Sequence, residues 1–292
     1  MKRNMSEQES PLAKVTEEAI SSGNTRSLYA WLCKNSHLPG TLPNLTIARA
    51  FADTCIMHAH RGEKLAVEMA TLDADAAPGG SELEFLPMCG VIAVGAYGAL
   101  HEKSRRDMLD VLHDRADDLR FRVRDAVVEA VAKMGAASED ALALEVATWM
   151  DGYFHAAAVL RALAHETWLH HLHDSTVVAM RLDEAFELAK KSPRAAARYP
   201  GRKALVEALA TATGSIANRF GVPIFDLLEK WSVVQDPELR ETIARAAQSK
   251  AVSSRYRPEV ERIRDALASS APSVRDPRTI VGPTRGRGKK RR

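Results

Sequence analysis

The fold is decided by two similar stretches of sequence, Asp118-Leu119-Arg120-Phe121-Arg122-Val123-Arg124-Asp125-Ala126-Val127 and Asp236-Pro237-Glu238-Leu239-Arg240-Glu241-Thr242-Ile243-Ala244. Each stretch opens with an aspartate, a residue type that commonly caps the first turn of a helix. An apolar residue followed by arginine comes next, as Val123-Arg124 and as Leu239-Arg240, and a β-branched residue stands three positions after each arginine. The two stretches therefore predict two related helix starts that lie far apart in the chain.

The composition of this 292-residue chain favours helices. Apolar residues make up 46% and charged residues 27% of the sequence, whereas aromatic residues make up only 5%, which excludes a collagen-like or fully disordered chain. Apolar residues recur at helical spacing from Pro11 to Ala268, and the alternation typical of strands is nearly absent. The sequence thus predicts an all-α protein.

Local signals set the expected helix boundaries. Asn44 stands where it would cap the helix that follows it, and Ser81 with Glu84 has the Ser-x-x-Glu form of a capping box. Gly135 is expected to end a helix over 119–134, because glycine commonly follows the last helical residue.

The expected helices group into pairs that recur along the chain. The starts of the second members lie 34 to 48 residues apart, which is typical of arrays in which each helix pair buries its apolar stripe against its neighbours. The sequence therefore predicts an α-solenoid of about six helix pairs, with second members starting near Leu45, Glu82, Leu119, Tyr153, Gly201 and Pro237.

The two aspartate–arginine stretches resemble the second helix of HEAT repeats, in which an Asp and an Arg recur at such positions and bond between neighbouring repeats. The chain is also similar to uncharacterised bacterial HEAT-repeat proteins through Leu38-Pro39-Gly40 and Pro43-Asn44-Leu45. The resemblance implies an armadillo-like, HEAT-like solenoid over residues 25–269. A lead helix and linker at 1–24 would precede it, and a disordered basic tail at 270–292 would follow. No assigned activity comes with this resemblance.

Cysteine usage and hydropathy indicate a cytoplasmic protein without a membrane span. The three cysteines, Cys33, Cys55 and Cys89, form no CxxC spacing and are odd in number, which argues against a disulfide framework. No apolar segment follows the basic residues at the N-terminus, so we expect no secretory signal. The uncharged run Phe85–Leu100 is shorter than the roughly 20 residues of a bilayer span, and a buried helix is expected there.

Charge is distributed unevenly along the chain. The formal net charge is +3, but residues 275–292 hold eight basic residues and one acid, so this segment carries +7 and residues 1–274 carry −4. A flexible cationic arm of this kind is suited to contact nucleic acid, acidic protein or an anionic surface, or simply to aid solubility.

Basic clusters supply the candidate nucleic-acid-binding residues. If second helices line a concave face, their arginines and lysines would form one stripe able to replace the counterions of phosphates. The alternative is that neighbouring acids such as Asp117, Asp118 and Asp125 neutralise them within or between repeats. The candidates are Arg120, Arg122, Arg124, Arg194, Arg198, Arg202 and Lys203 in the body, and Arg285, Arg287, Lys289, Lys290, Arg291 and Arg292 in the tail.

A histidine-rich segment supplies weak candidates for a metal site. A metalloprotease helix needs histidines four residues apart, whereas His165 and His170 are five apart, so that class is excluded. Glu166 with His170, or His170 with His173, would share a helix face and hold a divalent ion weakly. Solvated histidines at a helix end are the favoured interpretation, and no metal or cofactor is expected.

These observations favour a non-enzymatic scaffold or adaptor that binds a macromolecular partner, most simply a protein, on its concave face. The alternative is a nucleic-acid-binding HEAT protein, similar to the HEAT-like DNA glycosylases for alkylated bases. Those enzymes use aromatic side chains and a carboxylate in a basic cleft, and Trp149 and Asp151 lie close together in this chain, although no family motif surrounds them. The oligomeric state stays open.

Overall fold

The computed structural model describes residues 11–271, and within that range the chain is helical with no strand. The prediction of an all-α protein is therefore confirmed for these residues. The helices are α1 (Pro11–Ser22), α2 (Arg26–Lys34), α3 (Leu45–Ile56), α4 (Ala59–Ala70), α5 (Phe85–Leu100), α6 (Arg105–Ala116), α7 (Phe121–Ser138), α8 (Asp140–Glu145), α9 (Tyr153–Leu163), α10 (Glu166–Leu169), α11 (Ser175–Lys191), α12 (Pro200–Phe220), α13 (Val222–Trp231), α14 (Pro237–Ala247), α15 (Lys250–Arg255) and α16 (Arg257–Ser269). Short 3-10 turns are η1 (Glu82–Glu84), η2 (Glu102–Ser104), η3 (Val146–Asp151) and η4 (Arg194–Arg198).

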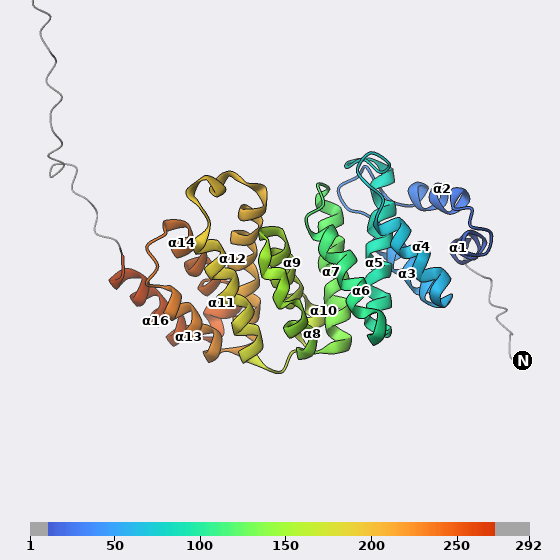
Figure 1. Cartoon of the computed structure of the whole chain (residues 1–292). Coiled ribbons are helices and arrows are strands. Elements are labelled where there is room, and N and C mark those ends of the chain that lie inside the picture. Colours follow the sequence, from blue (N-terminus) through green and yellow to red (C-terminus); the bar gives the residue numbers. More distant parts are fainter. Residues whose placement is uncertain (1–10, 272–292) are drawn as a thin grey trace, which may run out of the picture.

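The helices follow one another along an elongated molecule, from α1 at one end to α16 at the other (Figure 1). Helices α3, α5, α7, α9, α12 and α14 pack each against the next in that order, and we call them the central row. These six helices coincide with the expected second members of the helix pairs. Helices α4, α6, α8, α11, α13 and α16 contact the central row and form much of the neighbouring layer.

Helix α5 is the most deeply buried element of the described chain, with every residue from Phe85 to Gly98 in the interior. Glycines let its backbone touch its neighbours: a Cβ added at Gly90 would lie 2.2 Å from the backbone nitrogen of Ala70, and one at Gly95 would lie 2.5 Å from the Cα of Ala130. The segment Glu82–Leu100 is long and apolar enough to cross a membrane, but 83% of it is buried inside the protein. The apolar run is thus a core helix.

Two local expectations at helix termini are confirmed. The side chain of Asn44 accepts a hydrogen bond from the backbone of Ile47 at 3.3 Å, and Asp236 accepts from the backbone of Leu239 at 3.0 Å. A capping side chain satisfies backbone N–H groups that have no partner inside the helix, which fixes where the helix begins.

The expectation at Gly135 is wrong. Helix α7 continues to Ser138, and a Cβ added at Gly135 would lie 2.0 Å from the indole of Trp168. The glycine makes room for this fully buried ring, whose Nε1 donates to the carbonyl of Glu139 at 3.1 Å. The residue thus serves a close approach and does not end the helix.

The Ser81–Glu84 capping box is also absent, because Ser81 makes no capping hydrogen bond. Glu84 is fully buried instead, and its Oε2 accepts from the backbone of Gly80 at 2.8 Å.

One hydrophobic core runs through the described chain, from Leu12 in α1 to Ile263 in α16, so the lead helix packs as part of the body. The three cysteines are buried free thiols. Burial raises the pKa of Cys33 to about 11 and raises the pKa of Cys55 and Cys89 as well. Because the thiolate is the reactive form, none of them is suited to act as a nucleophile.

Candidate functional site

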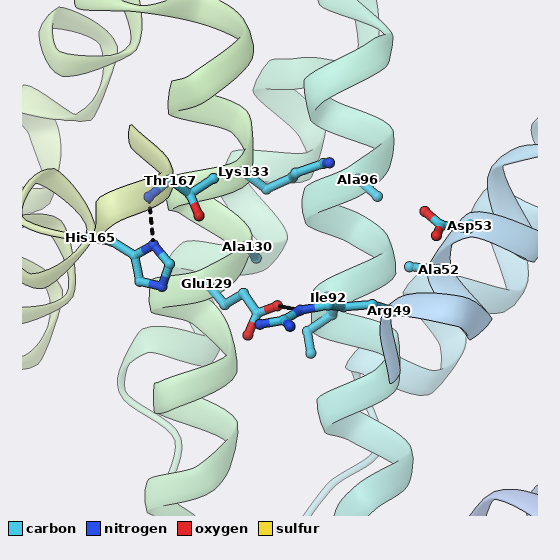
Figure 2. Close-up of a pocket in the computed structure, with 10 residues that line it drawn as sticks. All are labelled: Arg49, Ala52, Asp53, Ile92, Ala96, Glu129, Ala130, Lys133, His165 and Thr167. Carbon is cyan, nitrogen blue, oxygen red and sulfur yellow. Dashed lines mark hydrogen bonds and ion pairs between the residues drawn. The ribbon is translucent and has the colours of Figure 1, made fainter. Parts of the chain in front are cut away.

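Two neighbouring depressions lie on one face of the central row. The first, of about 310 Å³, is formed by α3, α5 and α7 together with the start of α10, and Figure 2 shows its lining residues. The second, of about 360 Å³, is formed by α7, α9 and α12. We call this surface the row face.

A long-range ion pair crosses the first depression. The Nε of Arg49 on α3 donates to the Oε1 of Glu129 on α7 at 2.5 Å, and the two side chains reach toward each other past Ile92 of the intervening α5 (Figure 2). This hydrogen bond to Glu129 raises the pKa of Arg49. The side chains of α3 and α7 thus meet across α5 within this depression.

Aromatic and charged side chains line the second depression. The guanidinium of Arg124 lies 4.3 Å from the centre of the Phe154 ring, and burial lowers the pKa of Arg124. Phe121 is 54% exposed at the edge of the depression, although it is a large apolar residue. Aromatic side chains with an arginine are typical of the residues that anchor protein interfaces.

The charges of the row face are balanced. Asp125 on α7 pairs with Arg161 on α9 at 2.8 Å, and Glu207 on α12 pairs with Arg245 on α14 at 2.8 Å. With Arg49 and Glu129, these pairs join different helices of the central row. A phosphate approaching them would have to compete with a carboxylate for each arginine.

The structure corrects the expected basic stripe at three residues, because Arg120, Arg122 and Arg202 are only 4%, 9% and 4% exposed. The N–H groups of Arg120 bond inside the protein. Its Nη2 donates to the carbonyl of Leu72 at 2.7 Å, and its Nε donates to Asp118 at 2.8 Å. It therefore ties the start of α7 to the end of α4 and offers nothing to a ligand.

Arg122 and Arg202 are likewise internal. The Nη1 of Arg122 donates to the buried Glu84 at 3.0 Å and its Nη2 donates to the carbonyl of Gly40 at 3.0 Å. Arg202 donates to the hydroxyl of Ser192 at 2.7 Å and pairs with Glu238. Each of the three arginines is thus paired with a carboxylate of the protein, as in the alternative to phosphate binding given above.

The other basic candidates of the body belong to α7, η4 and the start of α12. Arg198 and Lys203 are exposed near the start of α12, Arg124 is half-buried against Phe154, and Arg194 lies in η4. The remaining candidates, Arg285, Arg287, Lys289, Lys290, Arg291 and Arg292, lie outside the described residues.

The histidine-rich segment does not assemble a three-ligand site. His165 caps α10, its Nδ1 accepting from the backbone of Thr167 at 3.2 Å. Glu166 and His170 approach only to 4.0 Å with both side chains well exposed, and His173 is exposed beyond them. These are the solvated helix-end histidines that the sequence favours.

Three other ligand-type side chains do converge: His113 on α6, Asp151 at the end of η3 and His155 on α9 have their ligand atoms within 4.8 Å of one another. Burial, helped by the neighbouring His113, lowers the pKa of His155 and so favours its neutral imidazole. Sequence reasoning missed this group because His113 lies 38 residues before Asp151 and no spacing rule connects them.

Trp149 closes this group from one side. The indole is 3% exposed and packs edge-on against the ring of His113 at 5.2 Å between centroids. A buried ring in this position has no face free to stack on an extruded base. Trp149 and Asp151 therefore give no support to the glycosylase alternative.

Sequence reasoning also missed Glu129 and Phe154 as residues of the row face. Both are half-buried residues of predicted second helices, and only the register between neighbouring helices shows that they meet Arg49 and Arg124. A scan against protein-family models, a search of curated proteins and a search of solved structures each found no match to this chain.

Proposed function

We propose that this chain is a HEAT-like α-solenoid that acts as a non-enzymatic scaffold and binds a protein partner on the row face. The observation that carries the proposal is the hollowed row face itself, where two depressions lie beside ion pairs that bridge the central row.

The order of packing supports the solenoid part of the proposal. Each helix of the central row contacts the next, as expected when helix pairs stack in sequence. The two deciding stretches also share their local contacts. Asp118 and Asp236 each accept from the backbone nitrogen two residues later, and Arg124 and Arg240 each donate to the carbonyl six residues earlier.

The chemistry of the row face supports a protein partner. Protein interfaces combine aromatic anchors and arginines with a polar rim, and Phe121, Phe154 and Arg124 provide such a set around one depression. The paired carboxylates lower the attraction for a polyanion, because phosphate binding depends on arginines and lysines whose charge is not already neutralised.

Nucleic-acid binding is the second candidate, and the +7 charge of residues 275–292 is the observation that favours it. Binding through that segment would be electrostatic, would fall steeply with salt, and would not need the row face.

Co-purification from cells that express the chain, with and without nuclease, tests the proposal. The test variant joins Phe121→Ser to Lys133→Glu, two exposed residues that line the two depressions. The matched control joins Met180→Ser to Lys191→Glu, which likewise replaces an exposed apolar residue by serine and an exposed lysine by glutamate, but on α11. We expect a defined partner that survives nuclease, is lost with the test variant and is kept with the control.

Two results would contradict the proposal. One is a partner set that disappears with nuclease, together with salt-sensitive binding of DNA or RNA that the row-face variant retains. The other is equal recovery of the partner with both variants, because the row face would then not be the binding surface.

A further inference from the structure

The strongest unexplained cluster of side chains lies away from the row-face depressions, where the end of α6, the end of η3 and the start of α9 meet. The Nε2 of His113 lies 3.2 Å from the Oδ2 of Asp151, and the Nδ1 of His155 lies 3.3 Å from the Oδ1 of the same carboxylate. The two imidazole rings stack at 3.9 Å between centroids with 5° between their planes. Two imidazoles and a carboxylate thus bring their ligand atoms within 4.8 Å of one another.

These separations fit the edges of a tetrahedral coordination sphere. With metal–ligand bonds of about 2.0–2.1 Å, ligand atoms on a tetrahedral zinc ion lie about 3.3–3.4 Å apart. Both histidine–aspartate separations are close to that value. Because the two stacked rings are nearly parallel, both lone pairs face one ion only after the rings turn about the terminal side-chain torsion, which is soft in histidine.

Burial supports the same interpretation. The Nδ1 of His155 is enclosed and has no partner with hydrogen-bond geometry, although Asp151 is near. A Cβ added at Gly152 would lie 2.3 Å from this Nδ1, so glycine at this position keeps the space beside the nitrogen open. A metal ion would satisfy an enclosed imidazole nitrogen that lacks a hydrogen-bond partner.

The cluster is open on its other side. The side chain of Asp151 is 54% exposed, whereas those of His113 and His155 are 29% and 15% exposed. Three protein ligands with one side facing solvent leave a fourth position for water, the pattern of zinc sites that bind or activate a further ligand. Mixed nitrogen and oxygen ligands of this kind suit zinc and its neighbours in the transition series.

We propose that His113, Asp151 and His155 form a binding site for one divalent transition-metal ion, with Zn²⁺ as the ion to test. The proposal stands apart from the scaffold function, because the ligands lie outside both row-face depressions. The ion would pin α6, η3 and α9 together at the middle of the helix array.

Calorimetric titration of the full-length chain with Zn²⁺ alone tests the site. We expect one ion per chain, and a rise in Kd of about tenfold or more in His155→Gln and in Asp151→Asn, since even outer-shell changes cost 10- to 100-fold. The matched control is His170→Gln, which removes an imidazole from the exposed histidine-rich segment and should leave the Kd unchanged. Equal affinity in all four chains, or no saturable binding of one ion, would overturn the proposal.

A second readout needs no change to the ligands. Trp149 lies 5.2 Å from His113 and 6.4 Å from His155 between ring centroids, so Cu²⁺ bound at the site should quench its fluorescence. The quenched fraction should vanish in Trp149→Phe and persist in Trp231→Phe. Quenching that is unaffected by Trp149→Phe would place the ion elsewhere and contradict the assignment, even if a ligand variant failed to fold.

Discussion

The packing of α5 and the packing of α12 show two different ways of joining a helix to its neighbours. Around α5 the backbones themselves touch, since an added Cβ at Gly95 would lie 2.5 Å from Ala130. Around α12 an added Cβ at Gly214 would lie 3.2 Å from the carbonyl of Ala246, and large rings such as Phe186 and Trp231, stacked at 5.2 Å, fill the space nearby. The first region is fixed by its backbone spacing and the second by its side chains.

The same contrast holds for charge. Glu84 and Arg122 beside α5 are both buried, with side-chain exposures of 0% and 11%. Arg202 on α12 is 5% exposed, but its partner Glu238 is 44% exposed and reaches water. A lost partner is therefore harder to compensate in the first region than in the second.

The largest expected effect comes from Gly95→Ala. The added methyl group would overlap the backbone of α7, and we expect a loss of about 3 kcal/mol or more in the free energy of unfolding, or failure to fold. Gly214→Ala should change it by no more than about 1 kcal/mol, because better helix propensity offsets a mild contact. Urea unfolding measures both changes. Similar losses in the two variants would contradict the difference in packing between α5 and α12.

The next effect comes from Arg122→Leu, which strands the buried carboxylate of Glu84. We expect a loss of about 3 kcal/mol, because one partner of a buried ion pair is left uncompensated. Arg202→Leu should cost clearly less in the same urea assay. Joining Glu84→Gln to Arg122→Leu should restore part of the lost stability, and a double variant less stable than Arg122→Leu alone would refute this explanation.

A smaller effect is expected for Asp118→Asn. Burial raises the pKa of Asp118, but the hydrogen bonds and charge of Arg120, with Arg115, outweigh it and hold the pKa below its ordinary value. The ion pair therefore stabilises the fold at neutral pH, and its contribution is lost as the pH falls below about 4. We expect wild type to exceed the variant by about 1–2 kcal/mol at pH 7, with the gap narrowing as the pH is lowered below about 4. A gap that does not change with pH would contradict the assigned role.

The smallest effect is expected for Glu207→Gln. This change breaks the exposed pair with Arg245, and such surface pairs contribute little to stability because water and salt screen them. Thermal unfolding at low and high salt measures it, and the small difference from wild type should shrink as salt screens the charges. A loss of stability comparable to that of Arg122→Leu would show that this pair on the row face is needed for folding and is not free for binding.

Helix content and the order of the central row follow from local sequence signals, because apolar spacing and caps such as Asn44 and Asp236 act within one helix. Gly135 and Glu84 were misjudged because their roles depend on a partner from another element, Trp168 and Arg122 respectively. The convergence of His113 with Asp151 depends on how helices are placed in space, which no single-helix pattern encodes.

The same reason explains the misplaced arginines. An arginine at the start of a helix has the same periodicity whether its long side chain points to solvent or bends back to the carbonyls of the preceding helix. For Arg120 the carbonyls of Leu72 and Ala77 supply the deciding contacts, and both lie more than forty residues earlier in the chain.

The claim on which the account depends is that helix pairs stack in a line and leave one long face open. Small-angle X-ray scattering of the full chain and of residues 11–271 tests it most directly. We expect both to show an elongated pair-distance distribution, with a radius of gyration of the 11–271 chain well above the roughly 18 Å of a compact chain of that length. A value near 18 Å with a symmetric distribution would mean that the helices close into a compact bundle, and the open row face would not exist.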